Sequence, residues 1–236
     1  MNQIVTLILF SWIAGFTAFI GASLAALERF RESLLKKEII RGIVAFGGGI
    51  LIAAVAFALV PHGLETLTAP TLGLLFAAGG LTFCLLDIEL NRSGGSKAQF
   101  TAMLSDFIPE AIALGAVFAH DHRLGLLLAL FIGAQNLPEG FNAFRELREN
   151  TGRSALILWQ MFFVSFLGPA AALSGFFFLQ NFPAVTAGIM VFAGGGILYL
   201  VFQDIAPQAK LKHHWLPAFG AVLGFIVGLL GKKLLG

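Results

Sequence analysis

Residues 124–144 read LGLLLALFIGAQNLPEGFNAF, and this stretch decides the class of fold. Glu139 is the one ionisable side chain among its 21 residues. A helix needs about 20 predominantly apolar residues to cross the hydrocarbon core of a bilayer. The stretch therefore predicts a transmembrane helix that carries a carboxylate inside the membrane.

The rest of the chain has the same character. Of its 236 residues, 58% are hydrophobic and only 12% are charged, and the mean hydropathy is +0.88. This composition excludes a disordered chain, and the single Cys84 excludes a disulfide scaffold. The 15 Lys and Arg residues nearly balance the 13 Asp and Glu residues and are scattered through short loops, so we expect no nucleic acid partner.

We expect an all-α integral membrane protein with a single domain over residues 1–236. The first span begins with Met1-Asn2-Gln3, which lacks the basic residues of a signal peptide, so we expect a permanent span. Charged or Gly/Ser-rich segments at 28–39 and 91–97 read as loops. Eight apolar stretches are expected to form the spans: 2–27, 40–64, 70–90, 98–119, 123–147, 154–180, 184–208 and 214–235.

Basic residues predict the orientation of the spans. Alternate loops divide the Lys and Arg residues twelve to three, and loops rich in Lys and Arg stay in the cytoplasm. Both termini are therefore expected outside. The richer side has Arg29, Arg31, Lys36, Lys37, Arg41, Arg92, Lys97, Arg145, Arg148, Arg153, Lys210 and Lys212; the other has Arg123, Lys232 and Lys233.

Two short repeats indicate internal symmetry. Gly-Gly-Gly-Ile-Leu occurs at 47–51 and again at 194–198, and each copy is followed by a proline, Pro61 or Pro207. The two spans that carry these copies would run in opposite directions. We therefore expect spans 1–3 and 6–8 to form an inverted repeat, as in many secondary transporters, around a central antiparallel pair of spans 4 and 5.

The central pair carries the most informative motifs, Asp106-Phe107-Ile108-Pro109-Glu110-Ala111 and Gln135-Asn136-Leu137-Pro138-Glu139-Gly140. Each motif puts a carboxylate in an apolar helix, at a cost of at least ~2.5 kcal/mol. Residues three or four apart share a helix face, and each proline cannot donate to the carbonyl four residues before it.

If the two faces meet, carboxylate and amide oxygens converge in the bilayer. Such a cluster must hold protons or a cation, and its all-oxygen donors suit divalent ions such as Mn²⁺, Fe²⁺ and Zn²⁺. The alternative is that Glu110 and Glu139 are protonated or hydrogen-bonded groups that stabilise two kinked helices.

Eight spans with outward termini and Pro-Glu motifs on spans 4 and 5 resemble the ZIP family of divalent metal transporters, over essentially the whole chain. The fifth-span motif is close to the family signature. The fourth-span motif keeps Pro109 and Glu110 but has Asp106 and Phe107 where the family usually has His and Asn. Gly168 stands where some members have Glu.

The resemblance implies that Asp106, Glu110 and Glu139 occupy the primary metal site, with Gln135 and Asn136 at a depleted second site. It implies import of Zn, Fe, Mn or Cd ions by elevator-like alternating access across the bacterial inner membrane, with the metal as substrate and no catalytic cofactor. Spans 1, 4, 5 and 6 would slide against the others. The Asp106 carboxylate favours Mn²⁺ or Fe²⁺ without excluding Zn²⁺. The partners are metal ions and the lipid bilayer, and a homodimer is an open alternative.

Three other functions stay open: a membrane metal hydrolase, a non-transporting regulatory relative and a proton-coupled carrier of another solute. The hydrolase reading lacks an obvious His set, because none of the five histidines falls within the core of a span, whereas catalytic zinc sites commonly use His. Several polar residues outside the central motifs could touch a metal on its path or could simply be solvated ends: His62 and Glu65; His120, Asp121 and His122; Asp204; His213 and His214.

Overall fold

The computed structural model describes residues 2–28, 33–92, 98–212 and 214–235. Eight helical spans in these ranges are long and apolar enough to cross a membrane, which confirms the predicted all-α membrane fold. Most spans are single helices, and most of their ends lie within a few residues of the predicted limits. The second span begins earlier than predicted, at Leu34, so residues 34–39, expected in a loop, are helical. The helices are α1 (Gln3–Leu27), α2 (Leu34–Ala54), α3 (Val60–Thr66), α4 (Ala69–Arg92), α5 (Ala98–Phe118), α6 (His122–Thr151), α7 (Ser154–Val164), α8 (Leu167–Phe178), α9 (Pro183–Leu200), α10 (Ala206–Ala209) and α11 (Leu216–Leu235).

Three spans depart from the regular helix expected for them. The second and seventh each contain a π-helical turn, η1 (Val55–Leu59) and η2 (Val201–Ile205). Pro61 and Pro207 lie just after these turns and cannot donate to the carbonyl four residues earlier, so the wider turn absorbs the disrupted hydrogen bonding. The sixth span is broken between α7 and α8, where Pro169 cannot donate to the carbonyl of Ser165.

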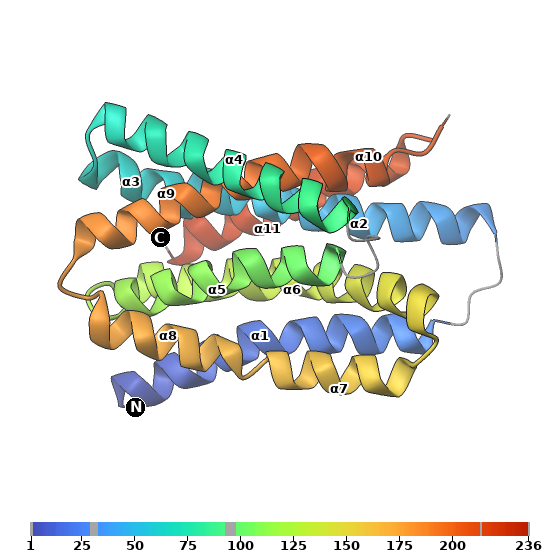
Figure 1. Cartoon of the computed structure of the whole chain (residues 1–236), viewed down its shortest axis with the longest axis horizontal. Coiled ribbons are helices and arrows are strands. Elements are labelled where there is room, and N and C mark those ends of the chain that lie inside the picture. The colour runs from blue at the N-terminus through green and yellow to red at the C-terminus, as the bar shows by residue number, and fades with distance from the viewer. Residues whose placement is uncertain (1, 29–32, 93–97, 213, 236) are drawn as a thin grey trace.

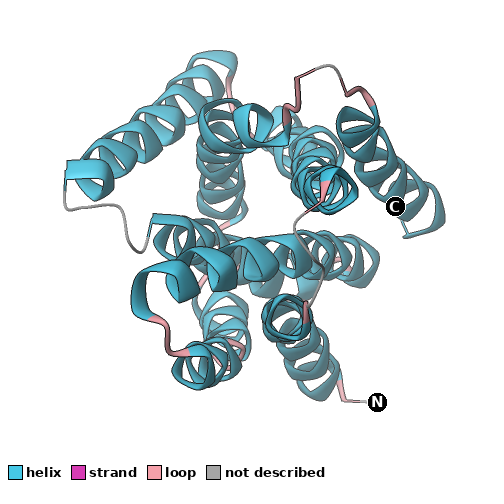
Figure 2. Ribbon diagram, turned by 90° about the vertical axis from the view of Figure 1, so that its right-hand side faces the viewer, coloured by secondary structure: helices cyan, strands magenta, loops and turns pink. Residues whose placement is uncertain are grey.

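The helices pack in two groups (Figures 1 and 2). The α5–α6 group contains α1, α5, α6, α7 and α8, and its most extensive contacts are α1 with α6 and α5 with α8. The α2–α11 group contains α2, α3, α4, α9, α10 and α11, and its main contacts are α2 with α11 and α4 with α9. The predicted sliding unit therefore corresponds to one packed group, while the inverted repeat stays a prediction.

Glycines bring the backbones of α1 and α6 into direct contact. A Cβ atom at Gly21 would lie 1.9 Å from the carbonyl oxygen of Leu137, and one at Gly140 would lie 2.2 Å from that of Ala18. No larger residue fits at either position without moving a helix. Equivalent close approaches join α5 to α8 at Gly115 and Gly175, α2 to α11 at Gly49 and Gly224, and α4 to α9 at Gly79 and Gly195.

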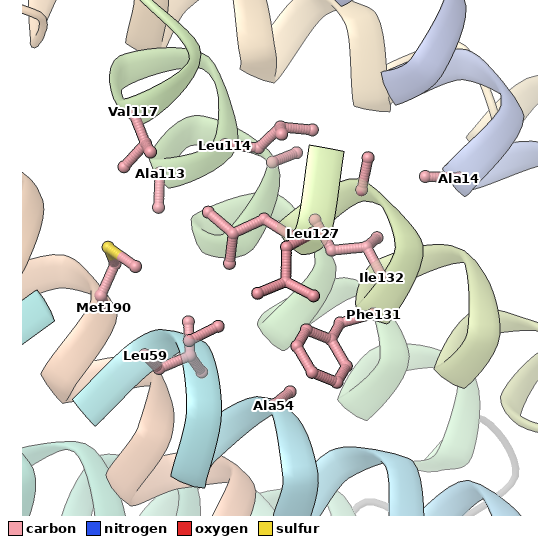
Figure 3. Close-up of a cluster of buried hydrophobic side chains, with 14 of the residues drawn as sticks. Ala14, Ala54, Leu59, Ala113, Leu114, Val117, Leu127, Phe131, Ile132 and Met190 are labelled. Carbon is pink, nitrogen blue, oxygen red and sulfur yellow. The ribbon is translucent and has the colours of Figure 1, made fainter. Parts of the chain in front are cut away.

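An apolar core joins the two groups near the α5–α6 turn. Figure 3 shows Leu59 and Met190 of the α2–α11 group facing Leu114, Leu127 and Phe131 of the α5–α6 group. Farther along the helices, an apolar groove of about 980 Å³ separates α1 and α6 from α2 and α11. The groups are thus tightly packed at one end and less so at the other.

The start of α1 and the end of α11 lie at the same end of the bundle (Figure 1, left). The start of α2, the end of α6 and α10, beside which the described basic residues of the loops stand in the sequence, lie at the opposite end (Figure 1), so the arrangement is compatible with the predicted orientation, which stays a prediction. Arg29, Arg31, Lys97 and the side chain of Arg92 are outside the described residues, as is most of the loop at 91–97.

Candidate metal site

Two neighbouring helices carry the five predicted ligands in the interior of the molecule. α5 carries Asp106 and Glu110, and α6 carries Gln135, Asn136 and Glu139. All five are buried; the most exposed, Glu139, has 6% of its surface accessible. Both prolines lie inside continuous helices, so the motifs present their polar groups without leaving the helical fold.

A hydrogen bond links the two helices at this point. Gln135 donates through Nε2 to Oε2 of Glu110, at 2.6 Å. The carboxylates of Asp106, Glu110 and Glu139 are also close enough to interact electrostatically, and when ionised they repel one another. The structure thus brings the three acids and Gln135 into one buried region.

Three buried side-chain oxygens at the site have no hydrogen-bond partner among the described residues: Oε1 of Gln135, Oδ1 of Asn136 and Oε2 of Glu139. An unsatisfied buried polar atom costs about 1–3 kcal/mol. The amide nitrogen of Asn136 donates to the carbonyl oxygen of Ala14 on α1, at 3.0 Å, which holds this side chain in place. The region therefore offers oxygen acceptors in fixed positions and lacks donors to satisfy them.

Charge at the site is also uncompensated. Among the described residues that are buried, none is Lys, Arg or His, whereas three are Asp or Glu. Ionised carboxylates in an apolar interior need a proton or a cation. Oxygen ligands from carboxylates and amides suit Mn²⁺ and other hard or borderline divalent ions.

Acidic side chains alone do not complete a ligand set. The described part of the chain contains no group of three or more His, Cys, Asp and Glu side chains arranged to hold a metal ion. One oxygen of Asp106 accepts a hydrogen bond from the backbone N–H of Phe107, at 2.7 Å. A bound ion would therefore depend on the amide oxygens of Gln135 and Asn136 as well as on the carboxylates.

Phe107 lies where α5 meets the crossing of α1 and α8. The tip of its ring would be 2.9 Å from a Cβ at Gly15 and 3.0 Å from one at Gly168, and the ring is 3% exposed. The side chain that replaces the expected Asn thus fills an apolar notch between two glycines. The sequence did not predict this notch or the hydrogen bond from Asn136 to the Ala14 carbonyl. A ring that packs between two glycines and a backbone oxygen that accepts a hydrogen bond cannot be recognised from residue types alone.

The polar residues at the α5–α6 turn have local structural partners. Asp121 caps α6 by accepting from the N–H groups of Arg123 and Leu124, both at 2.9 Å. His120 contacts the carbonyl of Gln180, and the His122 ring packs on Phe118. These contacts agree with an ordinary polar turn.

The remaining candidates have partners of their own. His62 interacts electrostatically with Glu65, which is also in α3, and with Asp121, which lies at the α5–α6 turn. Asp204 interacts electrostatically with Asp87 beside a small cavity that Ser105 also lines. The ring of His214 contacts Glu38 at 2.6 Å, and His213 is outside the described residues.

Comparison with known proteins gives one relevant similarity. No protein-family model matches the chain. Over 137 residues the chain is 31% identical to the zinc transporter GufA of Myxococcus xanthus. The match covers 57% of this chain and 54% of GufA, so it spans about half the length of that curated relative.

Proposed function

We propose that this chain, whose match to GufA supports a relationship to the ZIP family, transports divalent metal ions across a membrane. The observation that carries the proposal is the buried region shared by α5 and α6, with three carboxylates, two amides and no cationic side chain buried among the described residues. A packing role would need donors for its oxygens, and three of these oxygens have none in the described structure. A divalent cation would satisfy the oxygens and the charge together.

Each site residue has a distinct proposed role. Glu110 and Glu139 bind the ion through carboxylate oxygens. Asp106 contributes its other carboxylate oxygen, the one that does not accept the hydrogen bond from the backbone N–H of Phe107. Gln135 orients Glu110 through Nε2 and offers Oε1 to the ion. Asn136, held by Ala14, offers Oδ1. This oxygen-only set favours Mn²⁺ or Fe²⁺, with Zn²⁺ and Cd²⁺ also accepted.

Movement of one helix group against the other would give alternating access to the site. The ring of Pro138 faces α2, because a Cβ at Gly47 would lie 2.8 Å from its Cγ. The contact between the groups is therefore next to Glu139. The tight core at the α5–α6 turn and the groove at the other end support a state that is closed toward the termini.

The proposed setting is a bacterial inner membrane, with residues 1–236 as one transporter domain that imports its ions. The relationship to the ZIP family supports import. A relative named as a transporter, together with the absence of His from the five site residues, favours transport over metal-dependent hydrolysis.

Uptake into proteoliposomes tests the proposal. The assay compares Mn²⁺, Fe²⁺, Zn²⁺ and Cd²⁺ entry for the unchanged chain, the Glu110→Gln/Glu139→Gln double variant and Glu65→Gln. All three Glu→Gln substitutions preserve side-chain size. Because Glu65 is exposed, Glu65→Gln controls for the removal of a carboxylate outside the site.

Saturable uptake by the unchanged chain and the Glu65 variant, lost in the double variant, is the expected result. No uptake of any of the four ions by folded, inserted protein would refute transport. Equal uptake by all three proteins would refute the site.

A further inference from the structure

A second groove, which we call the Lys210 groove, lies on the α2–α11 group away from the metal site. It has a volume of about 550 Å³ and runs between α2, the η2–α10 segment and α11. Apolar side chains line the groove along the helices, and basic or aromatic side chains lie at the end near Lys210. The geometry points to a binding site for one anionic phospholipid.

The walls of the groove suit an acyl chain. Ala45 of α2 and Ala218 and Ala221 of α11 line it, and these small side chains leave space that larger ones would occupy. α2 and α11 belong to membrane spans, so the surrounding medium is hydrocarbon rather than water. Apolar contact with a lipid chain is therefore the natural way to fill this space.

Basic groups surround the mouth of the groove. Lys210 and Lys212 are exposed there, and Arg41 of α2 donates to the carbonyl oxygen of Lys210. The other charged groups at the mouth, Glu38 and His214, contact each other at 2.6 Å. Among the described residues at the mouth, the positive charges of Lys210, Lys212 and Arg41 thus outnumber the carboxylate of Glu38, which makes the mouth complementary to a phosphate headgroup.

Trp215 indicates where the mouth of the groove lies relative to the membrane. Its side chain is 82% exposed and lines the groove next to the basic residues. Tryptophan concentrates at the level of lipid headgroups, and this end of the bundle is the one that the basic loops predict to be cytoplasmic. The basic mouth would therefore meet the headgroups of the inner leaflet, whose anionic lipids attract basic residues.

A lipid bound here would contact only helices of the α2–α11 group. It would hold α10 and the π-helical turn before it against α2, where Gly48 already meets the side chain of Ile205. The site is independent of metal binding, so it stands or falls separately from the transport proposal.

Native mass spectrometry of the delipidated full chain tests the site, with phosphatidylglycerol and phosphatidylcholine of identical acyl chains as probes. Lys210→Gln/Lys212→Gln removes two charges at the groove. Lys232→Gln/Lys233→Gln removes two exposed lysines at the opposite end of the bundle and is the matched control. Ala218→Leu fills the groove and keeps the lysines, and glycerol phosphate supplies the headgroup chemistry without acyl chains.

One phosphatidylglycerol should bind in preference to phosphatidylcholine, with affinity roughly 10- to 30-fold weaker in the Lys210/Lys212 variant and unchanged in the control. Ala218→Leu should also weaken binding, and glycerol phosphate should not compete. Equal losses in the two lysine variants, equal binding of both lipids, or competition by glycerol phosphate would overturn the proposal. Melting temperatures of the lipid-free variants close to that of the unchanged chain show that folding is intact.

Discussion

Gly140→Ala tests whether the contact between α1 and α6 builds the site. The added Cβ would lie 2.2 Å from the carbonyl oxygen of Ala18, closer than the 3.0 Å that real Cβ atoms keep. Because the obstacle is backbone, α1 and α6 must separate by about 1 Å, and overpacking of this kind costs typically 1–3 kcal/mol. The same separation would stretch the 3.0 Å hydrogen bond from Asn136 to Ala14, which is worth about 1 kcal/mol.

Gly133→Ala is the matched control on the same helix. Its nearest neighbour, Cα of Ala14, would be 3.4 Å away, an ordinary contact, so the substitution should be neutral or slightly stabilising through helix propensity. Alanine also has a higher helix propensity than glycine, which offsets up to ~1 kcal/mol of the destabilisation caused by overpacking at Gly140. The expected net destabilisation by Gly140→Ala is therefore about 1–3 kcal/mol.

Thermal unfolding in detergent measures this difference. For a chain of this size, ~1 kcal/mol shifts Tm by about 2–4 °C, so Gly140→Ala should melt roughly 2–12 °C below the unchanged chain and at least as far below Gly133→Ala. Metal affinity should fall as well, since Asn136 loses its anchor on α1. If the two variants have the same Tm and the same metal affinity, the close contact does not support the site, and the reasoning is refuted.

Three further substitutions have contrasting expected effects. Phe107→Ala empties the notch between Gly15 and Gly168 and should destabilise the protein by about 3–5 kcal/mol in thermal unfolding, whereas Phe178→Ala, at a side chain that is 74% exposed, should change Tm little. Gln135→Leu removes the partner of Glu110 and an ion ligand, so calorimetry should show at least a roughly tenfold weaker metal affinity; unchanged affinity would exclude Gln135 from the site. Glu28→Gln breaks contacts with Lys36 at 2.9 Å and Arg145 at 3.8 Å and should lower stability by up to about 1 kcal/mol, less at high salt; an unchanged or salt-independent Tm would show that these pairs contribute nothing.

Hydropathy was sufficient to predict the eight spans, because backbone groups in lipid must find their hydrogen-bond partners within the protein and a long apolar stretch does so as a helix. It was less informative about their ends. α2 begins at Leu34 and α6 continues to Thr151, beyond the apolar stretches, because a helix can extend into charged sequence outside the hydrocarbon core. The π-helical turns depend on how Pro61 and Pro207 are packed, which periodicity does not encode.

The site shows the same division. Burial of the five polar residues on α5 and α6 follows from their motifs, since carboxylates within apolar helices must face protein rather than lipid. The support from α1 could not be predicted, because Asn136 is held by the backbone carbonyl of Ala14. The motif indicated that Phe107 replaces an amide ligand, but its fit between two glycines depends on the helix crossing, which the sequence does not show.

Locating the bound ion tests whether α5 and α6 together hold a divalent metal. Crystals soaked in Cd²⁺ or Mn²⁺ give anomalous scattering at the ion. We expect a peak between α5 and α6, within coordination distance of carboxylate oxygens from both Glu110 and Glu139 and of the amide oxygen of Gln135. The Glu110→Gln/Glu139→Gln variant should show no peak there. A peak only at the α5–α6 turn, near His62 and Asp121, or no peak at ion concentrations that saturate uptake, would contradict the account.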